Sequence, residues 1–185
     1  TAGKLFVIAA PSGAGKTSLV HELRRRDPNL RMCVSHTTRP RRPNEVDGRD
    51  YHFVDVPQFE TMIAADGFLE HARVFDHYYG TSRAALADAY ARGHDVILEI
   101  DVQGAAQVLE RVSDCLFVLL EPPSAEVQAE RLRGRGDPPE QAERRIEVAQ
   151  AELAEGRRLG AICIVNDDLE RTVAEVAALI AERRS

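Results

Sequence analysis

Continuous apolar runs alternate along the chain with segments whose apolar positions recur every three to four residues. Short continuous runs are typical of strands buried on both faces of a parallel sheet, and the longer spacing is typical of amphipathic helices. The alternation predicts βαβ units, and therefore an α/β fold with a parallel five-stranded core sheet covered by helices. The expected strands are Leu5–Ala9, Arg31–Val34, Asp95–Ile100, Cys115–Leu120 and Ala161–Val165.

Local signals place the ends of the expected helices. The helix that begins at Lys16 should end near Asp27, because Pro28 cannot continue it. Asp167 and Glu170 resemble a capping box at the start of a C-terminal helix. The other helices expected are Ser82–Arg92, Val102–Val112, Ser124–Leu132 and Pro139–Arg158.

Two segments interrupt this alternation within the one domain expected for 185 residues. Residues 35–81 contain short alternating strands, such as Tyr51–Val54 and Phe68–Arg73, between polar turns, which predicts an inserted β-rich subdomain. Arg131–Asp137 is an arginine cluster interrupted by glycines between two helices. Loops that must move often carry glycines at such junctions.

Composition narrows the class of protein. With 44% hydrophobic and 29% charged residues, and no run long enough for a bilayer, we expect a soluble globular protein without a membrane partner. The net charge of −6 argues against a nucleic-acid partner. Cys33, Cys115 and Cys163 form no metal or disulfide pattern, and the latter two are expected to be buried in strands. No secretory signal is present, so a cytoplasmic location is expected.

Residues 10–17 join the first strand to the first helix and fit the phosphate-binding pattern GxxxxGK[ST], with alanine at the first glycine. Gly13 and Gly15 let the backbone turn its N–H groups toward an anion. Lys16 supplies a positive charge for the β- and γ-phosphates, and the Thr17 hydroxyl can bind Mg²⁺. A glycine-rich turn that contains a lysine by chance is the alternative, but the flanking strand and helix favour a nucleoside triphosphate site.

Further motifs follow the phosphate-binding loop, and together they carry a family resemblance. With them in this order, the chain resembles guanylate kinases from about residue 6 to residue 168. Each motif alone is weak, whereas the ordered set is specific. The motifs are Ser35–Gly48, Tyr78–Thr81, Glu99–Asp101, Arg131–Gly136 and Val165–Asp168.

The resemblance implies a three-layer P-loop fold made of a core (1–34, 82–123 and 160–185), a GMP-binding β subdomain (35–81) and a helical lid (124–159). It also implies transfer of the γ-phosphoryl group of MgATP to GMP, giving ADP and GDP. GMP and ATP are then the expected partners, and the chain itself is either a monomer or a homodimer. The residues implied in ATP binding are Pro11, Ser12, Gly13, Ala14, Gly15, Lys16, Thr17, Ser18 and Asn166, the last near the adenine.

Guanine presents the donors N1–H and N2–H₂ beside the acceptor O6, so its pocket needs carboxylates and a hydroxyl. The resemblance implies that Glu70 and Asp101 accept from the donors, while Ser35 and Thr81 face O6 and N7. Without the resemblance, Glu70 would be interpreted as an exposed strand residue.

The phosphate of GMP needs guanidinium and phenol partners. The resemblance implies that Arg39, Arg42, Tyr51 and Tyr79 bind it, and that Glu45 orients an arginine.

Glu99 and Asp101 stand two residues apart at the C-terminal end of a buried strand, so they share a face where open parallel sheets bind ligands. The resemblance implies that Thr17 and Glu99 serve Mg²⁺, the latter through water, at a position where the family usually has aspartate. A strand-end carboxylate could instead cap the backbone of Gln103–Gly104.

Arg131 and Arg135 are one helical turn apart and can face the same way. The resemblance implies that they act with Lys16 and Arg145 as catalytic cations, which neutralise the charge on the transferring phosphoryl group. No general base is required, because the acceptor phosphate is already anionic.

Two other classes of protein are alternatives to this enzyme. Guanylate-kinase-like modules of scaffold proteins bind phosphorylated peptides, but their phosphate-binding loops are degraded, whereas Gly15, Lys16 and Thr17 are intact here. A related kinase acting on a phosphorylated sugar, such as ribose bisphosphate, would not need the guanine-edge residues at positions 35, 70, 81 and 101.

Overall fold

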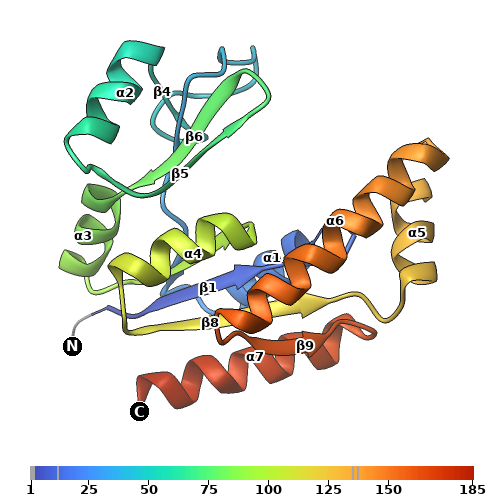
Figure 1. Cartoon of the computed structure of the whole chain (residues 1–185). Helices are drawn as coiled ribbons and strands as arrows, with labels where there is room; N and C mark the ends of the chain where they lie inside the picture. The colour runs from blue at the N-terminus through green and yellow to red at the C-terminus, as the bar shows by residue number, and fades with distance from the viewer. Residues whose placement is uncertain (1–2, 12, 135, 137) are drawn as a thin grey trace.

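The computed structural model describes residues 3–11, 13–134, 136 and 138–185. Its core is a five-stranded sheet in the order β2-β7-β1-β8-β9, and every neighbouring pair is parallel (Figure 1). The α/β fold expected from the sequence is confirmed. In the described part of the chain, no helix has both the length and the apolarity needed to cross a membrane. The strands are β1 (Leu5–Ala9), β2 (Leu30–Arg31), β7 (Asp95–Ile100), β8 (Cys115–Glu121) and β9 (Ile162–Val165).

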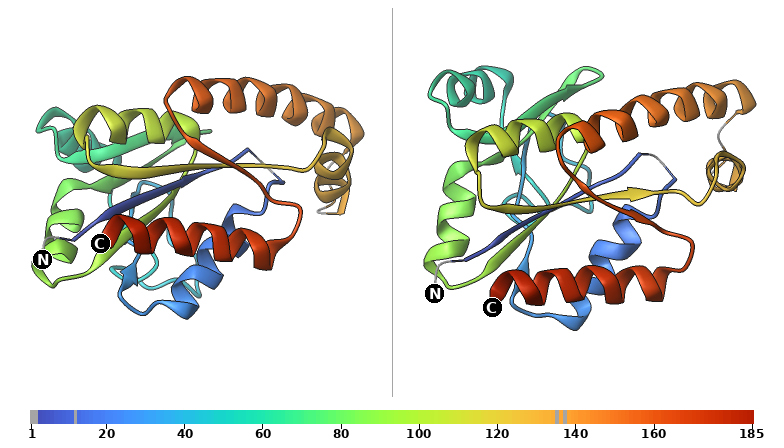
Figure 2. Two further views of the ribbon diagram at one scale, coloured as in Figure 1. Left: turned by 90° about the horizontal axis from the view of Figure 1, so that it is seen from below. Right: turned by 60° about the horizontal axis from the view of Figure 1, so that its bottom comes forward.

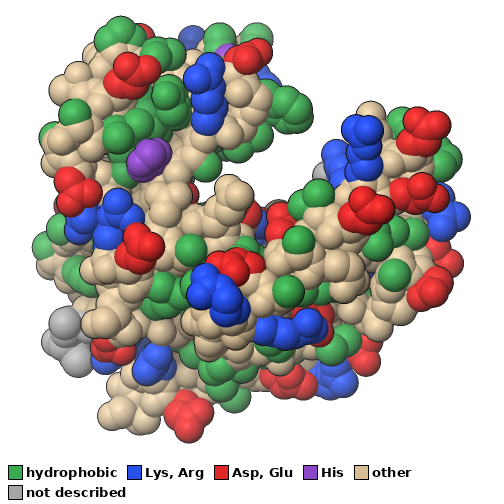
Figure 3. Space-filling model, in the orientation of Figure 1, with side chains coloured by type: hydrophobic (Ala, Val, Ile, Leu, Met, Phe, Trp, Pro, Cys, Tyr) green, Lys and Arg blue, Asp and Glu red, His purple; other side chains and the backbone are tan. Residues whose placement is uncertain are grey.

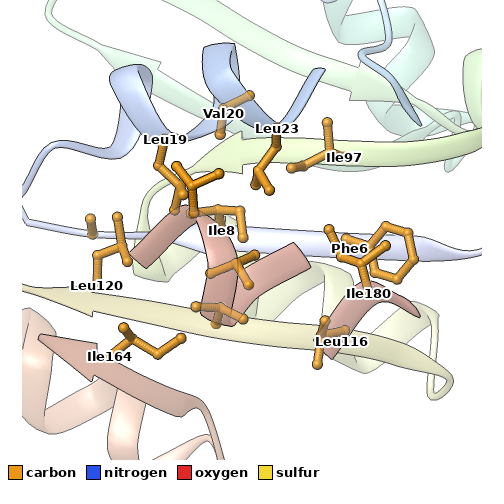
Figure 4. Packing of buried hydrophobic residues seen from close by; sticks show 14 of the residues in the cluster. Phe6, Ile8, Leu19, Val20, Leu23, Ile97, Leu116, Leu120, Ile164 and Ile180 are labelled. Atoms are coloured by element: carbon orange, nitrogen blue, oxygen red, sulfur yellow. The ribbon is translucent and has the colours of Figure 1, made fainter. Parts of the chain in front are cut away.

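Helices cover both faces of this sheet and give the three layers seen edge-on in Figure 2. One face is covered by α1 (Lys16–Arg26) and α7 (Leu169–Arg184), whose apolar side chains pack on Phe6 and Ile8 (Figure 4). Because side chains alternate along a strand, Val7 points to the opposite face. There it packs with α3, α4 and the end of α6. These helices are α3 (Arg83–Ala91), α4 (Val102–Arg111) and α6 (Pro139–Arg158).

A second sheet, of order β4-β3-β6-β5, forms a separate layer of strands above the core (Figure 1). It is built by residues of the segment expected to be inserted, and the expected strands correspond to β4 and β5. A helix, α2 (Val56–Ala64), was not expected there; it begins with a capping box of Asp55 and Gln58. Phe59 fastens α2 to this sheet by stacking on Phe68. The strands are β3 (His36–Thr37), β4 (His52–Phe53), β5 (Phe68–Val74) and β6 (His77–Ser82).

Helices α5 (Ala125–Gly134) and α6 form an arm on the other side of the molecule. The far half of α6 packs on α5, and its last turns cross the core sheet. Gly156 allows this crossing to be close, since a Cβ there would lie 2.7 Å from Cδ2 of Leu119 on β8. Figure 3 shows a deep hollow between the arm and the inserted subdomain.

Three details differ from the sequence-based expectations. Cys163 is exposed rather than buried, because β9 is the edge strand of the sheet, whereas Cys115 is buried as expected. The N-cap of α7 is Asp168, which accepts from the backbone of Arg171, and not Asp167. Strand β2 is also only two residues long, shorter than the four expected.

Candidate active site

The loop between β1 and α1 turns through two glycines in the left-handed region. Gly13 has φ 83° and Gly15 has φ 89°, a conformation that side chains with a Cβ rarely adopt. Gly15 is required for a second reason, since a Cβ there would lie 2.5 Å from Nδ2 of Asn166. The loop then leads directly into the N-terminus of α1, whose dipole favours an anion.

Two side chains that are distant in sequence hold this loop by hydrogen bonds to its backbone carbonyls. The Nδ2 of Asn166, a residue only 4% exposed, donates to the carbonyl of Ala14 at 2.8 Å, and its Oδ1 accepts from Thr172 at 3.0 Å. Arg131 on α5 donates to the carbonyls of Gly13 at 3.0 Å and Asn166 at 3.2 Å. The amide of Asn166 is thus engaged with the loop, and its expected contact with adenine stays a prediction.

A cavity of about 710 Å³ opens over the loop. Lys16 lines this cavity, and its Nζ donates to the carbonyl of Ile100 at 3.3 Å. The hydroxyl of Thr17 donates to Oε1 of Glu99, which brings together two oxygen ligands of the kind that Mg²⁺ prefers. We name this space the loop cavity; its lining is Ala10, Pro11, Gly13, Gly15, Lys16, Thr17, Ser18, Glu99, Asp101, Arg131 and Glu152.

A second cavity, of about 280 Å³, lies between the core and the inserted subdomain. We name it the subdomain cavity. Lys16, Glu99 and Asp101 line both cavities, so the two spaces adjoin at these residues. All four residues expected to recognise the base and two of those expected at the phosphate lie in its wall, namely Ser35, Tyr51, Glu70, Tyr79, Thr81 and Asp101.

Glu70 is buried in this wall, with 9% of its surface exposed, and is not the exposed strand residue considered as an alternative. Its Oε1 accepts a hydrogen bond of 2.8 Å from the Thr81 hydroxyl across the β5–β6 pair. Burial raises the pKa of the Glu70 carboxyl, and the nearby charge of Asp101 raises it further. An acceptor held in this way is suited to a ligand that presents N–H donors.

Asp101 has the capping role considered for a strand-end carboxylate, and its expected role at the base stays a prediction. Its Oδ1 accepts from the backbone N–H of Gly104 at 2.7 Å and so caps α4. The residue nevertheless lines both cavities, because it follows the C-terminal end of β7.

An arginine and a carboxylate form a bidentate pair in the loop after β3. The guanidinium of Arg39 donates to both oxygens of Glu45, at 2.9 and 2.8 Å, and lies 5.4 Å from the ring centroid of Tyr51. The hydrogen bonds from Arg39 lower the pKa of Glu45 to about 2. Glu45 also accepts from the backbone N–H of Arg42 at 2.9 Å, so it organises the segment that carries both arginines.

The remaining residues that were expected in the site do not line the two cavities or lie outside the described part of the chain. Arg39, Arg42 and Glu45 are not among the described residues that line either cavity. Arg145 lies on α6, half-buried, in the arm. Ser12 and Arg135 lie outside the described residues. In the lining of the loop cavity, Glu152 was missed, because it belongs to no motif and the helical pattern shows only that it is charged.

Comparison with known proteins identifies the family. The family model for guanylate kinase matches residues 2–183. The guanylate kinase of Alkalilimnicola ehrlichii is 50% identical over 98% of this chain and 90% of its own length, and that of Methylococcus capsulatus is 47% identical over 100% and 90%. This chain belongs to the guanylate kinase family.

The structural comparison agrees with this assignment. The crystal structure of guanylate kinase from Anaplasma phagocytophilum superposes with a TM-score of 0.73 at 30% identity, over 100% of this chain and 88% of that one. As a member of the guanylate kinase family, the chain phosphorylates GMP with ATP, and the activity expected from the sequence is confirmed.

A histidine pair beside the subdomain cavity is expected to make this guanylate kinase sensitive to acid. The His36 ring lies 4.6 Å from that of His52, and its Nδ1 is buried with no hydrogen-bond partner among the described residues. Burial lowers the pKa of His36, the charge of His52 lowers it further, and Asp47 opposes both. The unfolded chain therefore takes up the proton more readily than the folded one.

Stability should accordingly fall as the pH decreases below about 6.5, the ordinary pKa of histidine. The measurement is the urea midpoint at pH 7.5 and 5.5. His36→Gln should reduce the loss, whereas His21→Gln, at a side chain 74% exposed, should not. An equal loss in wild type and His36→Gln would contradict the assignment of the effect to His36.

Proposed function

We propose that the two adjoining cavities divide the substrates of the reaction between them. The phosphates of ATP bind over the loop, and GMP binds in the subdomain cavity with its phosphate directed toward Lys16. The observation that carries this proposal is the shared wall, because Lys16, Glu99 and Asp101 line both spaces. A donor and an acceptor bound on the two sides of that wall would meet at the lysine.

The guanine base is proposed to bind against Glu70 and Asp101. An ionised Glu70 offers oxygens to N1–H and N2–H₂, and Asp101 keeps the oxygen that does not cap α4. Ser35 supplies a hydroxyl donor for the O6 and N7 side, and Thr81, whose hydroxyl donates to Glu70 in this structure, would turn its O–H from Glu70 to the base. Adenine has no N1–H donor and carries an amino group in place of O6, so it would leave these buried groups without partners, which discriminates strongly.

The phosphate of GMP is proposed to bind Tyr51 and Tyr79 in the cavity wall, with Arg39 and Arg42 at its border. Glu45 already holds the guanidinium of Arg39 beside the Tyr51 ring. A guanidinium that is oriented before binding loses less conformational freedom when it meets a phosphate.

Thr17 and Glu99 fit a magnesium ion, since a hydroxyl and a carboxylate oxygen already lie together at the loop. When bound, Mg²⁺ would neutralise charge on the ATP phosphates. We propose that these two residues hold it, and that Glu99 supplies the negative charge for this purpose.

For the transfer itself, we propose that Lys16 and Arg131 supply positive charge from the core side and that Arg135 and Arg145 add to it from the arm. Arg131 is held by two backbone carbonyls, so its position is set before substrate binds. In this proposal residues 35–81 act as the GMP-binding subdomain and residues 124–159 as the lid over the core.

The proposal is tested by a coupled assay with GMP, AMP, UMP and ribose bisphosphate as acceptors. GMP should exceed AMP in kcat/KM by about 10⁴ or more, because the buried acceptors lose their partners with adenine. Comparable turnover of GMP and AMP would contradict the base-binding role of Glu70, and turnover of ribose bisphosphate would favour a sugar kinase.

A further inference from the structure

Glu152 is a charged residue in the wall of the loop cavity that the family resemblance did not identify. It lies on α6 and is half-buried. Leu153 is buried beside it, and Gly156 one turn later lies close against Leu119. Glu152 therefore stands on the end of α6 that is fastened to the core sheet, and its backbone is held in place relative to the loop.

The surroundings of the Glu152 carboxyl are strongly charged. Burial raises its pKa, the negative charge of Asp101 raises it further, and the positive charge of Lys16 lowers it. Glu99 and Arg131 line the same cavity from the end of β7 and from α5, and Arg145 lies seven residues earlier on the same face of α6. Of the two cations in the cavity wall, Arg131 is already held by the carbonyls of Gly13 and Asn166.

Lys16 is held much more weakly. Within the described part of the chain, its Nζ has one hydrogen bond, of 3.3 Å, to the carbonyl of Ile100. An ammonium group on a flexible four-carbon chain needs more than one partner to keep a fixed position. Of the other carboxylates in the cavity, Glu99 accepts from Thr17 and Asp101 caps α4.

We propose that Glu152 is a positioning residue that holds the ammonium group of Lys16 at the junction of the two cavities. The Ile100 carbonyl accepts a hydrogen bond from the ammonium at the strand end, and the Glu152 carboxylate attracts it as a charge in the wall of the same cavity rather than as a direct ion pair. Glu152 touches neither substrate in this role and acts on the reaction through Lys16. The inference rests on the proposed function, in which Lys16 meets the transferring phosphoryl group.

The experiment compares kcat and KM of Glu152→Gln and Glu152→Asp with wild type, at saturating GMP and ATP between pH 5 and 8. Because a misplaced catalytic group costs up to about a hundredfold in rate, Glu152→Gln should lower kcat about ten- to a hundredfold and leave both KM values within about twofold. Glu152→Asp should recover part of the loss. The matched control is Glu155→Gln, one turn later, where the carboxylate pairs with Arg158 on the surface.

The pH profile separates positioning from a structural role. Wild-type kcat should fall on the acid side as the Glu152 carboxyl of the enzyme–substrate complex is protonated. Glu152→Gln should keep only the part of this acid limb that comes from the substrate phosphates, whose second pKa is about 6. Protonation of Glu70 would weaken the binding of GMP, and at saturating GMP this effect appears in KM and not in kcat. An acid limb of wild-type size in Glu152→Gln would overturn the proposal, as would unchanged kcat or a loss confined to KM.

A double-mutant cycle with Lys16→Ala distinguishes the failure of this inference from the failure of the proposed function. If Glu152 acts through Lys16, Glu152→Gln should have no further effect on kcat in the Lys16→Ala background. If Glu152→Gln lowered kcat equally in the wild-type and Lys16→Ala backgrounds, the proposed role of Glu152 would be overturned, and the proposed function would stand. A Lys16→Ala enzyme with wild-type kcat would instead overturn the proposed role of the loop. Should Glu152→Gln fail to fold, the kcat and acid limb of Glu152→Asp decide the question.

Discussion

Replacing Lys16 with alanine is expected to lower kcat by about 10²–10³ or more. Removal of a single positioned donor to developing charge costs this much in other enzymes, and Lys16 also carries a full positive charge. The loop backbone should survive, because its shape depends on Gly13, Gly15 and the bonds from Asn166 and Arg131. The melting temperature and the affinity for GMP should therefore remain close to wild type.

Steady-state kinetics, calorimetric titration with GMP and thermal melting together check this result. Lys4 is the one other lysine in the sequence, at the start of the chain and outside both cavities, so Lys4→Ala is the matched control. A Lys16→Ala variant that retained most of its kcat would show that the loop is a structural turn.

Replacing Glu70 with glutamine is expected to lower kcat/KM for GMP roughly 30- to 1000-fold. This corresponds to a loss of about 2–4 kcal/mol of transition-state stabilisation. The amide keeps the shape of the side chain but offers one acceptor oxygen and places an NH₂ group against a donor of guanine. Most of the loss should appear in KM, because the base lies away from the transferring phosphoryl group. ATP affinity should hardly change, since the residues of the loop are untouched.

Two saturation curves measure this prediction, one with GMP varied at fixed ATP and one with ATP varied at fixed GMP. Glu60→Gln provides the control, because that side chain is exposed on α2, outside the cavity. Unchanged kcat and KM for GMP in Glu70→Gln would place Glu70 outside the base-binding site despite its burial.

The core of the fold could be predicted from sequence where local signals were strong. The bounds of β1, β7 and α6 were predicted to the residue, since apolar runs and a proline start marked them. Helix α2 was missed even though Asp55 and Gln58 form its capping box, because the alternating strands around it dominated the interpretation. The exposure of Cys163 could not be predicted, because an apolar run is the same in an edge strand and in a central one.

The candidate site was likewise predicted only in part. Motifs located the glycines of the loop, and the predicted pairing of Glu45 with an arginine is present as its bond to Arg39. No motif indicated that Asn166 fastens the loop or that Glu152 lines the loop cavity together with Lys16, since both arrangements join segments more than 100 residues apart. Such contacts depend on the packing of β9 and α6 against the core, which the linear pattern does not specify.

The close contact of Gly156 with Leu119 also provides a point about which α6 can tilt relative to the core sheet. In a helix that rises 1.5 Å per residue, Glu152 lies about 6 Å along the axis from this contact and Arg145 about 16 Å. Any tilt of α6 about the contact displaces each residue in proportion to that length. The arginine therefore sweeps nearly three times as far as the glutamate, so the arm could swing while the carboxylate stays close to its place beside the loop.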